Sequence, residues 1–306
     1  MKPGKIILGF ALLLILAHPA TASERLRIAA TTPSIASLAA EVAGREADVY
    51  SVAAANRNLH FITPTPKDVL KVKKADVFIH GGLDLEVWRG PLLDAVGRQD
   101  FISGSRAIDV SRNIALVDKP EEVSRAHGDI HLHGNPHYWT DPANAKVMTD
   151  TIAEGLSALY PEKSDEFRRN AEVYKTRLDA KMTEWQSRMA PFRGRAVVAY
   201  HDSWPYFLGR FGLSSAGFLE PKPGIPPTPR HFEELVQLMR KENVRVIIRE
   251  TYHEKKTPEK LAGETGAVIA VLQQDRSFEE GGYEASVERN VAALEAAFQL
   301  AEKASA

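Results

Sequence analysis

An uninterrupted helical stretch near the middle of the chain most strongly limits how this protein can fold. No glycine or proline occurs between Glu162 and Ala190. Apolar side chains recur there at steps of three and four residues: Phe167, Ala171, Tyr174, Leu178, Met182, Trp185 and Met189. This spacing predicts an amphipathic helix, about 43 Å long at a rise of about 1.5 Å per residue. A helix of that length predicts a rod that joins two folded units, over residues 161–192.

Short strand patterns alternate with helical patterns on both sides of this rod. Candidate strands are found at 26–30, 75–80, 195–200, 244–248 and 267–272, and candidate helices at 35–42, after Pro66, after Asp141-Pro142, at 201–211 and at 286–301. Alternation of strands and helices predicts parallel, doubly wound sheets. A faint repeat, Pro-Thr-Pro at 64–66 and again at 227–229, precedes a helix in each half. We therefore expect an α/β fold with two similar lobes, an N-terminal one over 23–160 and a C-terminal one over 193–306.

The first 22 residues have the pattern of a secretory signal peptide. Lys2 and Lys5 precede an apolar run at 6–17, and Ala20-Thr21-Ala22 follows as a small-x-small cleavage site. The run is too short to span a bilayer, which takes about 20 apolar residues. Because no cysteine follows it, we expect no lipid anchor. The sequence predicts a soluble, exported protein located in the periplasm.

Composition excludes several classes of function. The 306 residues include no cysteine, which excludes disulfides, thiolate catalysis and thiolate metal sites. The formal net charge is −1, and loss of residues 1–22 removes two lysines and no acid, which leaves −3. A chain whose basic and acidic residues are nearly equal in number is not expected to bind nucleic acid or anionic lipid through a broad electrostatic surface.

Three histidines lie in loops where a functional residue is expected. His60 precedes a predicted helix, His137 precedes the helix that starts at Asp141-Pro142, and His201 directly follows a predicted strand. Ligands of open α/β sheets bind at the carboxyl ends of strands, and neutral imidazole is a common zinc ligand. The three are too far apart to form a local motif such as HExxH. Their spacing alone leaves a metal site and ordinary surface histidines as alternatives.

The segments around these histidines resemble the ligand motifs of a known family. The matching strings are His60 with Pro64-Thr65-Pro66, NPHYWTDP at 135–142, YHDSWPYF at 200–207 and GFLEP at 217–221. They are similar, in the same order, to motifs of the zinc/manganese substrate-binding proteins of bacterial ABC transporters. The resemblance covers essentially all of residues 23–306, and it implies two Rossmann-like lobes with one metal ion in the cleft between them.

The resemblance also implies a set of ligands. His60 and His137 would bind the metal from the first lobe, and His201 from the second. The fourth ligand of the family is commonly an aspartate after the last strand, which corresponds to Asp275 here; Glu250, at the end of another strand, is the alternative carboxylate. Three imidazoles and one carboxylate suit tetrahedral Zn²⁺, whereas Mn²⁺ favours more oxygen ligands, so we expect Zn²⁺ ahead of Mn²⁺.

A second group of histidines precedes His137. The string AHGDIHLHG at 126–134 contains His127, His131 and His133. Zinc carriers of this family often have a mobile loop rich in histidine at this point. The group is therefore an auxiliary metal-capture loop or a solvated loop without a role.

The resulting expectation is a carrier and not an enzyme. The protein would be a monomer that captures one metal ion and delivers it to the membrane permease of an ABC transporter, with a periplasmic metallochaperone as a further partner. One alternative is a zinc hydrolase with a three-histidine site and Glu250 or Asp202 as its general base. Another is a haem or siderophore carrier, which would need a wide cleft with aromatic or arginine contacts.

Overall fold

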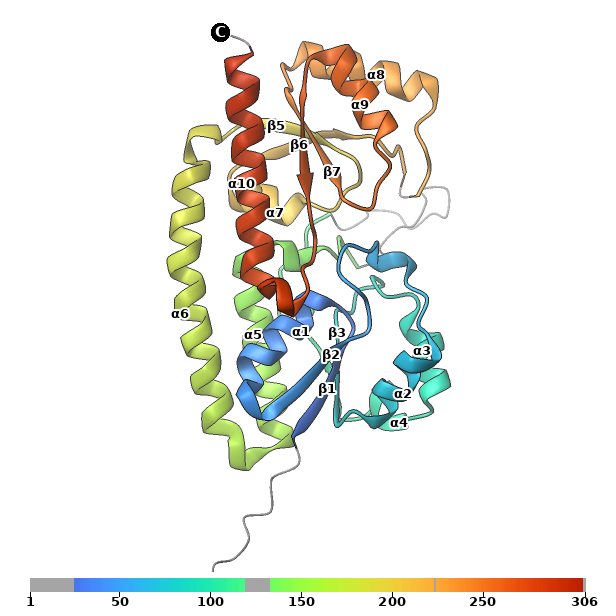
Figure 1. The fold of residues 1–306 in the computed structure, drawn as a ribbon, viewed down its shortest axis with the longest axis vertical. Helices are drawn as coiled ribbons and strands as arrows, with labels where there is room; N and C mark the ends of the chain where they lie inside the picture. Colours follow the sequence, from blue (N-terminus) through green and yellow to red (C-terminus); the bar gives the residue numbers. More distant parts are fainter. Residues whose placement is uncertain (1–24, 119–132, 223, 305–306) are drawn as a thin grey trace, which may run out of the picture.

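Two parallel sheets of four strands each form the framework of the protein (Figure 1). The computed structural model describes residues 25–118, 133–222 and 224–304. In the first sheet the strand order is β2-β1-β3-β4, and every pairing is parallel. Its strands are β1 (Leu26–Ala30), β2 (Ala47–Ser51), β3 (Val77–His80) and β4 (Ala107–Asp109). This sheet confirms the doubly wound α/β class expected for the N-terminal lobe.

The second sheet repeats the topology of the first. Its order is β6-β5-β7-β8, again with parallel pairings throughout. The strands are β5 (Ala196–Ala199), β6 (Ser214–Phe218), β7 (Val246–Glu250) and β8 (Val268–Leu272). In both sheets the first strand of the lobe lies second in the order, so the faint sequence repeat corresponds to a repeated fold.

Helices connect the strands of each lobe. Those of the first lobe are α1 (Pro33–Ala43), α2 (Pro66–Lys74), α3 (Arg89–Val96), α4 (Gln99–Ile102) and α5 (Pro142–Leu159). Those of the second are α7 (Pro205–Arg210), α8 (Pro229–Lys241), α9 (Lys256–Thr265) and α10 (Gly282–Lys303). Thr65 and Thr228 each cap the helix after the repeated Pro-Thr-Pro, since each side chain accepts a backbone N–H of the first turn. Such caps satisfy donors that a helix leaves unpaired at its start.

The predicted rod is α6 (Ser164–Met189), a helix of 26 residues. Short 3₁₀ helices, η5 (Pro161–Lys163) and η6 (Ala190–Phe192), extend it at both ends to the predicted limits of 161 and 192. Its buried side chains belong to the predicted apolar stripe: Phe167, Ala171, Tyr174, Leu178, Trp185 and Met189. Burial of this stripe, and not helix propensity alone, stabilises so long a helix in water.

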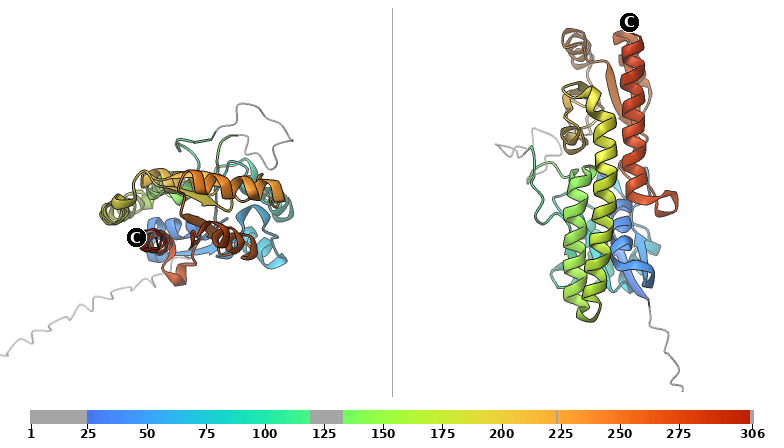
Figure 2. Two further views of the ribbon diagram at one scale, coloured as in Figure 1. Left: turned by 90° about the horizontal axis from the view of Figure 1, so that it is seen from above. Right: turned by 90° about the vertical axis from the view of Figure 1, so that its left-hand side faces the viewer.

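A second long helix accompanies α6 from one lobe to the other. Figure 2 shows α10 running beside α6 along the long axis of the molecule, and α10 packs against α1, α6 and β8. The Arg177 guanidinium of α6 pairs with Glu41 of α1 and Glu284 of α10, each at 2.7 Å. The lobes are therefore joined by two parallel helices with cross-links between them, and not by α6 alone.

Three strands were absent from the sequence expectations. β2 and β6 contain few large apolar residues, and β4 has only three residues. Strands such as SSAGF are stabilised by pairing with a neighbouring strand, which sequence periodicity does not record. The helix expected from 201 begins instead at Pro205, because residues 201–204 form the loop after β5.

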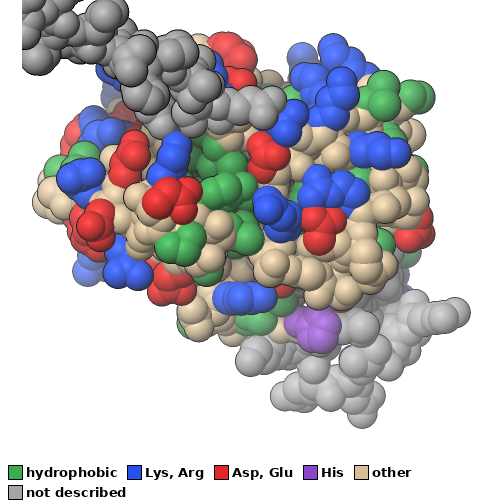
Figure 3. Space-filling model, turned by 90° about the horizontal axis from the view of Figure 1, so that it is seen from below, with side chains coloured by type: hydrophobic (Ala, Val, Ile, Leu, Met, Phe, Trp, Pro, Cys, Tyr) green, Lys and Arg blue, Asp and Glu red, His purple; other side chains and the backbone are tan. Residues whose placement is uncertain are grey.

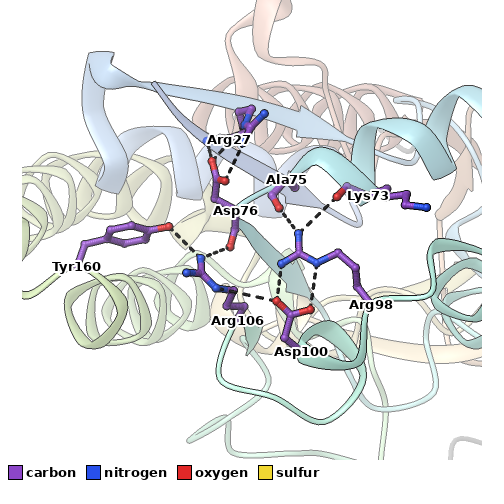
Figure 4. A network of polar contacts seen from close by, with 8 residues as sticks. All are labelled: Arg27, Lys73, Ala75, Asp76, Arg98, Asp100, Arg106 and Tyr160. Atoms are coloured by element: carbon purple, nitrogen blue, oxygen red, sulfur yellow. Dashed lines mark hydrogen bonds and ion pairs between the residues drawn. The ribbon is translucent and has the colours of Figure 1, made fainter. Parts of the chain in front are cut away.

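The end of the first lobe that lies away from the second carries many charged side chains around a hydrophobic patch near its centre (Figure 3). Figure 3 shows this face from below, with basic and acidic side chains interspersed. Near the starts of the strands, Asp76 accepts hydrogen bonds from Arg27 at 2.9 to 3.2 Å, while Arg106 donates to the Asp76 carbonyl and to Tyr160 of the α5 end (Figure 4). These bonds tie the strands to α5. Among the described helices, none is both long enough and apolar enough to cross a bilayer.

Candidate metal centre

The three predicted histidines come from loops at the carboxyl ends of strands. His60 lies on a short 3₁₀ helix, η2 (Leu59–Phe61), between β2 and α2. His137 lies between β4 and α5, directly before η4 (Tyr138–Thr140). His201 follows β5 in the second lobe. Parallel strands bring such loops to one edge of each sheet, and these two edges face one another between the lobes.

The structure brings the three imidazoles together. One ring nitrogen from each of His60, His137 and His201 lies within 4.8 Å of the others. The Nε2 atoms of His60 and His137 are 3.1 Å apart. Two nitrogens bound to tetrahedral zinc at about 2.0–2.1 Å would be separated by about 3.3–3.4 Å. The observed spacing of this pair is therefore close to that of two nitrogens bound to one zinc ion.

Two of the histidines are oriented by hydrogen bonds on the nitrogen away from the cluster. Asn135 Oδ1 lies 2.9 Å from His137 Nδ1, and Glu220 Oε2 lies 2.9 Å from His201 Nδ1. Each bond leaves Nε2 to face the cluster. Histidines that bind metals in proteins almost always carry such a partner, which fixes the tautomer and the ring orientation.

The three histidines differ in exposure. His137 and His201 are 1% and 8% exposed, whereas His60 is only partly buried. Burial lowers the pKa of His201, but the hydrogen bond that its Nδ1–H donates to Glu220 and the charges of Glu250, Glu220 and Asp202 outweigh this effect, so that the pKa is raised above 6.5. A cation in place of the proton would benefit from the same negative surroundings.

Asp275 is near the lobe boundary but outside this cluster. It follows β8 and is 3% exposed. Its Oδ1 accepts the Ser34 backbone N–H at the start of α1 at 2.9 Å, while its buried Oδ2 has no hydrogen-bond partner. Burial raises the pKa of Asp275 to about 6. The group of donors within 4.8 Å does not include it, so its role as fourth ligand stays a prediction.

The alternative carboxylate, Glu250, is committed to other contacts. It is fully buried, with Oε1 accepting Trp204 Nε1–H at 2.9 Å and Oε2 lying 2.8 Å from His253 Nδ1. The His253 ring also stacks on Tyr200, with centroids 3.9 Å apart. Both oxygens of Glu250 thus hold the loops around His201, and Glu250 is not among the donors that lie within 4.8 Å of one another.

The remaining histidines lie elsewhere. His127 and His131 of the predicted capture loop fall outside the described residues, and His133 is exposed. His80 is buried at the end of β3 beside Arg89, and His231 Nε2 lies 2.8 Å from the Phe218 carbonyl. His80 and His231 are therefore held by contacts of their own.

Hydrogen bonds cross between the lobes around the cluster. Trp139 Nε1 donates to the Gln274 carbonyl at 3.3 Å, and Tyr283 OH donates to the Trp139 carbonyl at 2.7 Å. The Arg210 guanidinium makes two 2.8 Å bonds to Asp141, the N-cap of α5. The cluster lies between surfaces that are already in contact.

Comparison with known proteins identifies the family. The family model described as "Zinc-uptake complex component A periplasmic", ZnuA, matches residues 28–297. The chain belongs to this family. The match covers both sheets and the linking helix, and it confirms the family resemblance of the three motifs.

Relatives of the chain differ in the metal that their names record. The zinc-binding lipoprotein AdcA of Streptococcus pneumoniae is 25% identical over 283 residues, 89% of this chain and 56% of AdcA. The iron-binding protein YfeA of Yersinia pestis is 26% identical, over 82% of this chain and 77% of YfeA. This chain therefore spans little more than half the length of AdcA. The family is that of metal-binding solute-binding proteins, and membership does not fix the metal.

A solved structure supports the fold. The solute-binding protein FpvC of Pseudomonas aeruginosa, in complex with Mn²⁺, superposes with a TM-score of 0.76 at 23% identity, over 90% of this chain and 99% of FpvC. At this identity the likeness concerns the fold: two α/β lobes and a long joining helix.

Asn135 and Glu220 support the histidines, but no role was predicted for either from the sequence. Both lie within the quoted motifs, NPHYWTDP and GFLEP. The sequence feature that could have indicated these roles is that each is a polar residue inside one of the motifs. Their contacts with His137 and His201 depend on how the loops fold back, which spacing in the sequence does not show.

Proposed function

We propose that this protein captures a divalent metal ion, Zn²⁺, between its lobes and delivers it to the permease of an ABC transporter. The observation that carries the proposal is the convergence of three imidazole nitrogens within 4.8 Å from loops of both lobes. Such a site binds an ion only when the lobes hold their present arrangement. Capture by both lobes suits a carrier, because separating the loops releases the ion.

The donor set favours zinc over manganese. Three nitrogens from neutral imidazoles match the tetrahedral nitrogen-rich sites of Zn²⁺, whereas Mn²⁺ is better served by carboxylate and water oxygens. Asn135 and Glu220 hold the Nδ1 atoms of His137 and His201, so that Nε2 is the ring nitrogen that each of these histidines would offer to the ion. Nitrogen-rich sites also bind Ni²⁺ and Cu²⁺, so selection for zinc would depend on metal availability as well.

We propose Asp275 as the fourth ligand. Its Oδ2 is a buried oxygen without a hydrogen-bond partner, and a buried carboxylate gains most from a cation beside it. Oδ1 is held by Ser34 of the other lobe, so coordination through Oδ2 would require a short movement of the loop after β8. Glu250 is the weaker candidate, because Trp204 and His253 occupy its oxygens.

The remaining parts of the proposal concern export and partners. Residues 1–22 would be cleaved as a signal peptide, leaving a monomer in the periplasm; sequencing of the exported protein from its N-terminus is expected to start at Ser23. His127, His131 and His133 would capture zinc weakly and pass it to the site, directly or from a metallochaperone. The lobes over 23–160 and 193–306 would each present a face to the permease.

The alternative functions fit the site less well. A zinc hydrolase needs an oriented general base, but both oxygens of Glu250 are hydrogen-bonded to Trp204 and His253. Burial raises the pKa of Asp202 to about 6, which leaves it as the remaining candidate. A haem or siderophore needs a wide cleft, whereas the three nitrogens converge on a volume that suits one ion.

Metal titration of the chelator-stripped protein tests the proposal. We expect one tight Zn²⁺ per chain, measured by competition with a chromophoric chelator. His60→Ala and His201→Ala should each weaken binding by more than the roughly 10–100-fold that loss of an outer-shell partner costs. His231→Ala serves as the control and should leave affinity unchanged, because Nε2 of His231 lies 2.8 Å from the Phe218 carbonyl and His231 is outside the group of donors that converge within 4.8 Å.

Other results would contradict the proposal. Binding that survives both ligand substitutions and disappears in the double variant His131→Ala/His133→Ala would place zinc on the loop alone. Hydrolysis of ester or peptide substrates that depends on zinc and on Asp202 would favour an enzyme. A Soret band after incubation with haem, lost in His60→Ala, would favour a haem carrier.

A further inference from the structure

Asn135 makes a hydrogen bond with each of its polar groups. It is 6% exposed and lies two residues before His137. Its Oδ1 accepts from His137 N at 3.0 Å and lies 2.9 Å from His137 Nδ1, while its Nδ2 donates to the Asp202 carbonyl at 2.9 Å. Its backbone carbonyl accepts Tyr206 OH at 2.7 Å, and its N–H donates to the Val117 carbonyl at 2.9 Å.

The partners of the Asn135 amide fix which way it points. A backbone N–H can only donate, and a carbonyl oxygen can only accept. Oδ1 must therefore face His137 N and Nδ2 must face the Asp202 carbonyl, because exchanging them would lose both bonds. Since Oδ1 is an acceptor, His137 Nδ1 must carry the hydrogen. Nε2 of His137 is then left with its lone pair, directed to the cluster where His60 Nε2 lies 3.1 Å away.

The same amide joins the two lobes at the site. Asp202 is the neighbour of His201, the ligand from the second lobe, and Tyr206 lies in the first turn of α7. One side of Asn135 thus touches a ligand of the first lobe, and the other side touches the backbone next to a ligand of the second. Movement of one lobe against the other would break the Nδ2 bond and would disturb the support of His137.

We propose that Asn135 is a positioning residue that selects the metal-binding tautomer of His137 and couples it to the His201 loop of the other lobe. The inference rests on the proposed function, because it concerns the same site. It assigns to one buried amide two tasks that are separable by substitution: accepting the His137 Nδ1 hydrogen, and donating to the Asp202 carbonyl.

Two variants separate these tasks. Asn135→Asp keeps acceptor oxygens for His137 N and Nδ1 but has no donor for Asp202. Asn135→Ala removes both contacts. Tyr206→Phe, which loses only the hydroxyl bonded to the Asn135 carbonyl and to Val117 N, is a control for the loss of another bond between lobes. Asn58→Ala is the matched control in sequence, because Asn58 Oδ1 accepts the backbone N–H of His60 two residues later.

Long-range ¹⁵N–¹H NMR correlations of the histidine rings provide the direct readout. In the zinc-stripped wild type and in Asn135→Asp, we expect His137 to carry its hydrogen on Nδ1; in Asn135→Ala we expect a mixture of tautomers. Zinc affinity, measured by chelator competition, should fall about 10–100-fold in Asn135→Ala. It should fall less in Asn135→Asp, whereas both variants should unfold at lower temperature than the wild type.

Several outcomes would overturn the inference. A hydrogen on Nε2 of His137 in the wild type, or a zinc affinity in Asn135→Ala within twofold of the wild type, would contradict it. An equal loss of affinity in Tyr206→Phe or Asn58→Ala would reduce Asn135 to a general structural contact. If Asn135→Ala does not fold, the tautomer of His137 measured in the wild type and in Asn135→Asp still tests the proposed role of Asn135. If the wild type binds no zinc, the proposed function fails, while the NMR result still tests the role of Asn135.

Discussion

Glu220 Oε2 lies 2.9 Å from Nδ1 of His201, and the same oxygen accepts the Gly224 N–H at 3.1 Å. Both side chains of the pair are almost fully buried, at 13% and 10% exposure. A carboxylate behind a histidine makes the imidazole a stronger donor to a metal. The pair also links the site to the backbone at Gly224, so the position of His201 depends on this contact as well.

Substitution of Glu220 tests the importance of this contact. We expect Glu220→Ala to lower zinc affinity about 10–100-fold, and Glu220→Gln to lower it less, because the amide oxygen still accepts the Nδ1 hydrogen. Chelator competition measures the change. Glu233→Ala, an exposed glutamate of α8, is the matched control. Equal affinities for Glu220→Ala and Glu233→Ala would show that the contact does not matter for binding.

Zinc affinity should fall with decreasing pH, because a proton on Nε2 and a metal ion compete for the same lone pair. The pKa of His201 is raised above 6.5, so its proton is held at a higher pH than that of a free imidazole. We therefore expect the loss of affinity to begin above pH 6.5 as pH falls. In Glu220→Gln the onset should move to lower pH. Titrations from pH 8 to pH 5 measure this, and a constant affinity over that range would refute it.

The lobes should rotate little when the metal binds. Two long helices, α6 and α10, run side by side between the lobes, and Arg177 cross-links them. We expect crystal structures of zinc-loaded and zinc-stripped protein to differ by a rotation of less than roughly 20°, smaller than the closure of hinge-type binding proteins. Release would then need a small tilt and loop motion. A larger rotation between the two crystals would show that α6 bends or that the cross-links break.

Tryptophan fluorescence should report binding through Trp139. Its ring centroid lies 5.4 Å from that of His137, so a divalent charge on His137 changes the field around the indole. We expect Trp139→Phe to remove most of the emission change on zinc addition. Trp185→Phe should keep it, because Trp185 lies on α6 and its Nε1 donates to Glu288. A signal that survives Trp139→Phe would come from Trp204, from Trp88, whose Nε1 donates to the Leu59 carbonyl beside His60 at 2.8 Å, or from a change in the whole fold.

The contribution of Glu86 to the stability of the zinc-stripped protein should decrease as pH rises from about 4.5 to about 7. Burial raises the pKa of Glu86 from 4.5 to about 7, despite hydrogen bonds from Thr31 and Gly81. A raised pKa in the folded state means that the protonated form is favoured by folding. This contribution is complete below pH 4.5 and is lost as pH rises through 7, at up to about 1.4 kcal/mol per pH unit.

Chemical denaturation of the wild type and Glu86→Gln at several pH values measures this effect. The variant cannot titrate at position 86, so its free energy of unfolding should depend less steeply on pH. Asp202 and Asp275, whose pKa values burial raises to about 6, contribute a slope of the same sign. His80, whose pKa burial lowers to about 4, contributes a slope of the opposite sign. Parallel pH profiles for the two proteins would show that Glu86 does not titrate in this range.

The three candidate histidines could be chosen from the sequence because each is embedded in a motif near the end of a strand. His60, His137 and His201 were predicted together, and the structure brings them together. Asp275 was placed correctly after β8, but its bond to Ser34 could not be foreseen. Ser34 is 241 residues away in the chain, and a contact of that range leaves no periodic signal.

The sequence alone determined the long helix, the alternation of strands and helices, and the set of histidines, because these depend on local spacing of apolar residues and on short motifs. Only the tertiary structure decided which nitrogen each histidine presents, which carboxylates are already hydrogen-bonded, and how α10 joins α6 between the lobes. Those features arise from side chains of distant segments that meet when the lobes pack. Hydrogen-bond geometry between such segments is set by the three-dimensional arrangement of the backbone and not by any pattern along the chain.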